Sequence, residues 1–91
     1  MYQVIFTDSY KKLAEKWVKK HPNIKSKYYN TLRMLEINPF HNSLRLHKLK
    51  GTMFEYYSVS IDMKYRIIID FILDKDKIIP LDIGDHSIYS K

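Results

Sequence analysis

Three neighbouring segments decide the fold of this chain: MFEYYSVSI (residues 53–61), YRIIIDFIL (residues 65–73) and KIIPLDI (residues 77–83). They are rich in β-branched and aromatic residues, which are typical of strands. The connectors Asp62-Met63-Lys64 and Asp74-Lys75-Asp76 are short enough for hairpin turns. The pattern predicts three consecutive strands in an antiparallel meander. Pro80 has no N–H to donate to a sheet, so we expect an edge position or a bulge there.

The N-terminal half of the chain changes to helical periodicity. Residues 2–7 (YQVIFT) predict a short strand, and the side-chain oxygens of residues 7–9 can cap a following helix. Apolar residues recur at helical spacing from residue 10 to about 20 and from about 24 to 37, with a break at Pro22. The predicted order is β-α-α-β-β-β, an α+β fold with an N-terminal helical hairpin packed on one face of an antiparallel sheet.

Length and charge narrow the class of protein. The chain has 91 residues and a formal net charge of +6, which predicts a single domain over residues 1–91. Residues 1–51 carry 11 Lys and Arg against 3 Asp and Glu, whereas residues 52–91 carry 5 against 7. The basic first half favours a polyanionic partner, nucleic acid first, and solvated lysine-rich helix faces are an equally weighted alternative. With no cysteine, no long apolar run and no signal-peptide pattern, we expect a cytoplasmic protein that no membrane segment anchors.

Side chains that could bind a phosphate or transfer a proton occur in three short segments: HKLKG (residues 47–51), YR (residues 65–66) and IGDH (residues 83–86). They place two histidines, an arginine and two lysines at the ends of predicted strands. This is the set of residues needed to bind a phosphate and to transfer protons around it.

Each of these residues also has a purely structural interpretation. Arg66 opens an apolar strand, where it predicts either a phosphate clamp or an ion pair, for instance with Asp62 or Asp70. His47 taken alone is more often a surface residue than a catalytic one. Tyr89 can stack on a nucleobase or pack against the sheet.

Several chemistries have no support in the sequence. The histidines lack metal-ligand spacing, Gly51 and Gly84 are the only glycines, and no Gly-x-Ser-x-Gly elbow occurs. We therefore expect no metal, no cofactor, no nucleotide-binding loop and no serine-hydrolase site.

The motifs HKLKG, YYSVSI, YRIIID and IGDHSIY, in this order, resemble the RelE/ParE toxin superfamily of toxin–antitoxin systems. The resemblance covers nearly the whole chain and is greatest to the YoeB/YafQ branch, whose members cut mRNA in the ribosomal A site. It implies a RelE-like fold, a cognate antitoxin partner, and a ribosome-dependent mRNA endoribonuclease that needs no metal.

The resemblance also implies residue roles. His47 matches the acid–base residue of that branch, Arg66 its phosphate-binding arginine, and His86 its proton donor. Tyr89 matches the terminal aromatic that packs on a base, and Lys50, with its neighbour Lys48, would bind substrate. We expect His47, Arg66 and His86 to meet on one concave basic surface.

Two features depart from the family pattern. RelE carries two lysines on the strand after the glycine where this chain has Ser58 and Ser60, which favours the histidine-based chemistry. Tyr89 lies one residue closer to His86 than the usual spacing. The alternatives are a ParE-like toxin that acts on DNA gyrase without nuclease activity, and a degenerate homologue that only binds its antitoxin.

Overall fold

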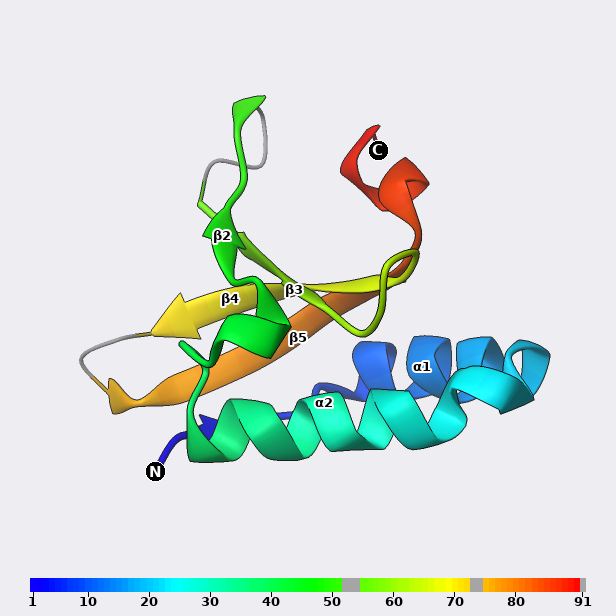
Figure 1. Ribbon diagram of the computed structural model, residues 1–91, viewed down its shortest axis with the longest axis horizontal. Coiled ribbons are helices and arrows are strands. Elements are labelled where there is room, and N and C mark those ends of the chain that lie inside the picture. The colour runs from blue at the N-terminus through cyan, green and yellow to red at the C-terminus, as the bar shows by residue number, and fades with distance from the viewer. Residues whose placement is uncertain (52–54, 73–74, 91) are drawn as a thin grey trace.

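The computed structural model describes residues 1–51, 55–72 and 75–90. Its helices and strands, in chain order, are β1 (Gln3–Val4), α1 (Asp8–Lys20), α2 (Lys25–Ile37), β2 (His47–Lys48), β3 (Tyr57–Ser60), β4 (Arg66–Ile72) and β5 (Lys77–Gly84), with the short 3-10 helices η1 (Pro22–Ile24), η2 (Asn42–Leu44) and η5 (His86–Ser90). Both α-helices lie on one side of the sheet, and the C-terminal η5 lies on the other side (Figure 1). The α+β fold class agrees with the prediction.

The sheet has five strands in the order β1-β5-β4-β3-β2. β3, β4 and β5 form the predicted antiparallel meander. Two pairings were not predicted: β1 runs parallel to β5, and β2 pairs antiparallel with β3. The strand predicted over residues 2–7 is limited to Gln3–Val4, the residues that pair with β5. Residues 53 and 54 of the first predicted meander strand, and residue 73 of the second, lie outside the described residues.

Pro80 lies beside an irregularity in the β4–β5 ladder. Ile68 pairs with Asp82 and Ile69 pairs with Pro80, so the register shifts and Leu81 is left without a partner on β4. A bulge accommodates a residue that cannot donate to the ladder. Of the two predicted alternatives, an edge position or a bulge, the structure has the irregularity beside Pro80, and β5 is not an edge strand because β1 pairs with it.

Capping and proline set the helix boundaries. Oγ1 of Thr7 accepts a hydrogen bond from the Tyr10 N–H at 3.2 Å, so α1 begins at Asp8, two residues before the apolar periodicity does. The chain leaves helical geometry at His21 (φ −130°), directly before Pro22. The resulting turn brings α2 back beside α1.

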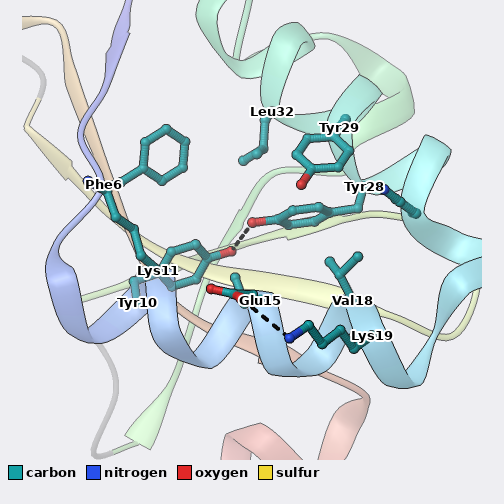
Figure 2. A pocket seen from close by; sticks show the side chains of 11 residues that line it. Phe6, Tyr10, Lys11, Glu15, Val18, Lys19, Tyr28, Tyr29 and Leu32 are labelled. Atoms are coloured by element: carbon teal, nitrogen blue, oxygen red, sulfur yellow. Dashed lines mark hydrogen bonds and ion pairs between the residues drawn. The ribbon is translucent and has the colours of Figure 1, made fainter.

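A groove of about 510 Å³ lies between the two helices (Figure 2). Its lining includes the buried residues Tyr10, Tyr28 and Leu32, the exposed aromatic Tyr29, and exposed lysines. No feature of the sequence pattern predicted this groove.

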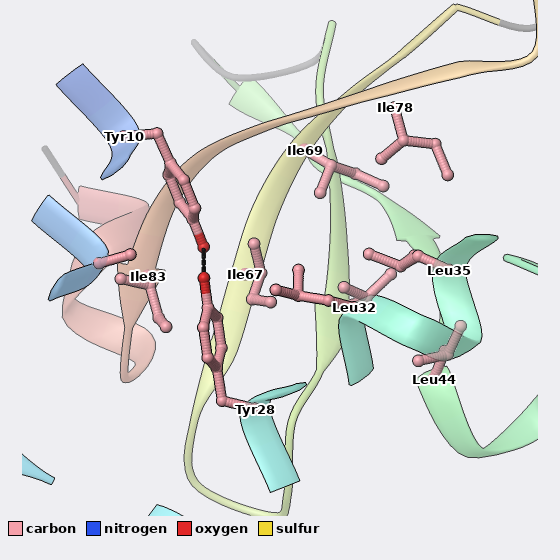
Figure 3. Packing of buried hydrophobic residues seen from close by; sticks show 11 residues of the cluster. Tyr10, Tyr28, Leu32, Leu35, Leu44, Ile67, Ile69, Ile78 and Ile83 are labelled. Atoms are coloured by element: carbon pink, nitrogen blue, oxygen red, sulfur yellow. Dashed lines mark hydrogen bonds between the residues drawn. The ribbon is translucent and has the colours of Figure 1, made fainter. Parts of the chain in front are cut away.

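The main core joins both helices to the face of the sheet that they cover. Leu32 and Leu35 from α2 pack in one cluster with Ile67 and Ile69 from β4 (Figure 3). Within this cluster the hydroxyls of Tyr10 and Tyr28 form a hydrogen bond at 2.9 Å. Burial raises the pKa of Tyr10 above its usual range, so this phenol stays neutral.

The opposite face of the sheet has a smaller apolar cluster. It consists of Leu49, Ile68 and Ile88, with Tyr56 and Tyr89 packed against it. Ile88 belongs to η5, so the C-terminal segment folds back over the face that the α-helices leave open. We call this face of the sheet the open face.

Among the described residues, no helix has the length and apolar character needed to cross a membrane.

Candidate active site

His47 lies on the edge strand β2, where it pairs with Ser58 of β3. Its Nδ1 is 3.1 Å from the carbonyl oxygen of Arg45. Because a carbonyl oxygen only accepts, this contact places the proton of the neutral imidazole on Nδ1 and leaves the lone pair on Nε2. In its neutral form the exposed ring therefore has an acceptor nitrogen, Nε2, with no hydrogen-bond partner among the described residues, as a general base requires.

A pocket of about 370 Å³ adjoins this histidine. It is lined by His47, Lys48, Leu49, Lys50 and Tyr89. Four of the six residues predicted from the sequence thus lie around one hollow. Among the described residues neither lysine forms an ion pair, so both ammonium groups can attract an anion.

Tyr89 lines this pocket from the C-terminal segment. Its hydroxyl lies 2.5 Å from Oγ of Ser58, and its ring packs against the open-face cluster. The imidazole of His86 meets the Tyr89 ring edge-on, with the ring centroids 5.6 Å apart. His86 itself is exposed and lies outside the pocket lining.

Arg66 is held by a neutral partner. Its Nη1 donates a hydrogen bond to Oγ of Ser60 at 2.9 Å, and its Nε is buried and has no hydrogen-bond partner among the described residues. Within the described residues no carboxylate pairs with it, so the predicted alternative of an ion pair with Asp62 or Asp70 is not observed. Asp62 instead accepts hydrogen bonds from the backbone amides of residues 64 and 65 and shapes the β3–β4 turn.

Strand register relates these residues to one another. His47, Ser58 and Ile68 are successive cross-strand partners, and Ser60, Arg66 and Gly84 form another such row. Directly paired residues point to the same face of a sheet. The row that contains His47 includes Ile68 of the open-face cluster, and Arg66 lies two residues before Ile68, so both project on the open face.

The turn into η5 positions His86. Asp85 Oδ1 accepts a hydrogen bond from the Ser87 N–H at 2.9 Å. Hydrogen bonds from Ser87 lower the pKa of Asp85 below its usual range, so the carboxylate is charged and shapes the turn. The segment then folds back so that Ile88 packs on Ile68.

Two further residues contribute to this site, Ser58 and Ser60, and the sequence did not predict them as partners of Tyr89 and Arg66. The two residues are 0% and 6% exposed, yet each forms a hydrogen bond with a predicted site residue. Their alternation with Val59 is typical of a strand with one polar face, but nothing in the sequence indicates which residues they contact. Within residues 1–51, 55–72 and 75–90, no group of three His, Asp or Glu is placed to hold a metal ion.

No known family profile matches the chain, and no curated protein does. Solved structures do. YafQ from E. coli strain BL21(DE3) has a TM-score of 0.76 and 13% identity, with 97% of each chain covered. The YoeB/ParE toxin from Agrobacterium tumefaciens has a TM-score of 0.70 and 20% identity, over 92% of this chain and 98% of that one.

A third similar structure comes from a complex. The E. coli DinJ–YafQ toxin–antitoxin complex contains a chain with a TM-score of 0.74 and 17% identity, over 96% of this chain and 94% of that one. The protein therefore has the RelE-like fold of the YafQ and YoeB toxins, as the sequence resemblance predicted.

Proposed function

We propose that this protein is the toxin of a type II toxin–antitoxin pair and that it cleaves mRNA on the ribosome. The observation that carries the proposal is the hydrogen-bonding environment of the Arg66 guanidinium. Its guanidinium is held by a neutral hydroxyl, with no carboxylate paired to it among the described residues, on the same face as His47. A cation held in this way keeps its charge for an external anion, and guanidinium groups match phosphate geometry.

In the proposed reaction the 2′-hydroxyl of one nucleotide attacks the adjacent phosphorus. Nε2 of His47 takes the hydroxyl proton, the new bond from O2′ to phosphorus forms, and the bond from phosphorus to the 5′-oxygen breaks. His86 gives a proton to that departing oxygen. The products are a 2′,3′-cyclic phosphate and a 5′-hydroxyl, and no oxidant or other reactant is needed.

The remaining residues bind and stabilise the substrate. Arg66 and Lys50 stabilise the charge that develops on the phosphorane oxygens, usually the largest catalytic contribution. Lys48 holds a neighbouring phosphate. The ring of Tyr89, which lines the same pocket as the two lysines, stacks on a nucleobase.

The proposed partner is an acidic antitoxin. One similar structure is a toxin–antitoxin complex, DinJ–YafQ, which supports a partner of this kind. Acidic side chains of an antitoxin would compete with phosphate for Arg66 and the pocket lysines. An amphipathic helix with acidic flanks suits the groove between α1 and α2, because Lys11 and Lys25 line it beside the mutually paired Lys19 and Glu15. Binding should weaken with salt, since exposed charges are screened beyond about 8 Å at physiological ionic strength.

The test is an RNA cleavage assay with purified protein, carried out with free mRNA and with mRNA on programmed ribosomes. Cleavage only on ribosomes supports the proposal. Growth arrest in cells without cleavage would favour the gyrase-directed alternative. Neither cleavage nor growth arrest, with retained antitoxin binding, would identify a degenerate homologue.

A further inference from the structure

Two serines on one strand each bind a different member of the proposed site. Ser58 and Ser60 of β3 both face the open side of the sheet, separated by Val59, which is in the main core. Ser58 bonds to the hydroxyl of Tyr89, and Ser60 accepts from Arg66. A buried hydroxyl without a partner is unfavourable, so both contacts are also expected to be persistent.

We propose that Ser58 and Ser60 are positioning residues: Ser60 fixes the plane of the Arg66 guanidinium and Ser58 fixes the ring of Tyr89 over the pocket. The inference rests on the proposed function and adds the residues that orient its substrate-binding groups. Neither serine takes or gives a proton in the reaction.

A neutral acceptor suits Arg66 better than a charged one. A guanidinium has five N–H donors in a fixed plane, so one bond at Nη1 restricts its rotation and leaves other donors for a ligand. A carboxylate in the place of Ser60 would hold the plane equally well but would neutralise the charge and compete with phosphate. Serine therefore orients Arg66 without reducing its attraction for an anion.

The role of Ser58 follows from its place in the sheet. It is the direct cross-strand partner of His47, so a side chain bonded to Ser58 is held beside that histidine. Tyr89 reaches this point from η5, and Ile88 anchors the segment on Ile68. The hydroxyl bond adds a second attachment, which restricts the ring in the orientation that faces the pocket.

The experiment measures single-turnover cleavage on programmed ribosomes for Ser58→Ala and Ser60→Ala. Each variant should be slower by on the order of tenfold, the effect of losing one hydrogen bond to a functional group. The matched control is Thr31→Val, which removes another buried hydroxyl bond, from Thr31 Oγ1 to the carbonyl oxygen of Lys27 within α2, a helix that contributes no residue to the proposed active site. This control should lower stability to a similar degree and leave the cleavage rate unchanged.

Double variants separate positioning from general structural effects. Ser60→Ala should cause no further loss in an Arg66→Ala background, because it acts only through that arginine. Ser58→Ala and Tyr89→Phe remove one bond from opposite ends, so the double variant should be no slower than the slower single variant. Additive losses, or single variants with wild-type rates, would overturn the inference.

A binding measurement keeps this inference distinguishable from the proposed function. Fluorescence anisotropy would give the affinity for an RNA oligonucleotide with a 2′-deoxy substitution at the cleavage position, which binds but cannot react. If the wild type binds this RNA but cleaves nothing, cleavage is refuted, and the serine inference stands only if Ser60→Ala and Ser58→Ala weaken binding by about tenfold. If the wild type neither binds nor cleaves, both proposals fail.

Discussion

Replacing Arg66 with alanine should remove activity while preserving the fold. Among the described residues the side chain makes one hydrogen bond, to Ser60, which contributes about 0.5–3 kcal/mol depending on how far its charge strengthens the bond. Its buried, unpaired Nε opposes this contribution, since an unsatisfied buried donor costs about 1–3 kcal/mol in the native state. The two effects largely offset each other, but the variant leaves the buried Ser60 hydroxyl without its partner, so the free energy of unfolding should fall by about 1–2 kcal/mol.

The effect on cleavage should be much larger. Removing one preorganised donor from developing charge typically slows a reaction by about 10²–10³-fold. The assay pairs urea unfolding, followed by circular dichroism, with single-turnover cleavage on programmed ribosomes. The exposed Arg33 of α2 offers a matched control, since Arg33→Ala should alter neither quantity.

Two results would refute this reasoning about Arg66. A loss of about 3–5 kcal/mol in stability would indicate a broken buried ion pair rather than a lost phosphate ligand. A folded variant with the wild-type rate would show that the guanidinium does not contribute to the reaction.

Three further predictions concern the C-terminal segment. His86→Gln should slow cleavage by about 10²–10⁴-fold if His86 is the general acid, and a full rate in this variant would withdraw that role. In Gly84→Ala the new Cβ would lie 2.7 Å from Cγ2 of Ile88 and displace η5. We expect the free energy of unfolding to fall by about 1–3 kcal/mol. Unchanged stability would contradict the packing of Ile88 against this position. Hydrogen bonds from Ser87 lower the pKa of Asp85 in the folded state, so these bonds should stabilise the turn at neutral pH and be lost as the pH falls below about 4. NMR titration of the Ser87 amide would show this loss. An Asp85→Asn variant with the same acid transition would refute the prediction.

The meander could be predicted from sequence because its signals are local. The segments rich in β-branched residues and the short connectors between them predict β3, β4 and β5. The proline inside the last segment predicts the irregularity beside it. None of these signals depends on residues far away in the sequence. Capping and proline likewise predict the helices closely. The parallel pairing of β1 with β5 could not be predicted, because it joins Val4 to Ile78 across most of the chain and nothing local encodes it.

The sequence predicted which residue types would line the candidate pocket, but not the contacts that these residues make. Histidine, arginine and lysine at strand ends indicated phosphate chemistry, and four of the predicted residues line one pocket. The partners of Arg66 and Tyr89 depend on the β3–β4 register and on how η5 folds back. Both are tertiary features, which explains why two ordinary serines were not predicted as parts of the site.

The most direct test of the account is the chemistry of the RNA ends. We expect mRNA on ribosomes, cut by the purified protein, to give a 5′ fragment that ends in a 2′,3′-cyclic phosphate and a 3′ fragment that begins with a 5′-hydroxyl, both identified by mass spectrometry. A single 2′-deoxy substitution at the cut position should abolish cleavage there. Cleavage that survives this substitution, or fragments with a 3′-hydroxyl and a 5′-phosphate, would contradict attack by the 2′-hydroxyl and the roles given to His47, Arg66 and His86.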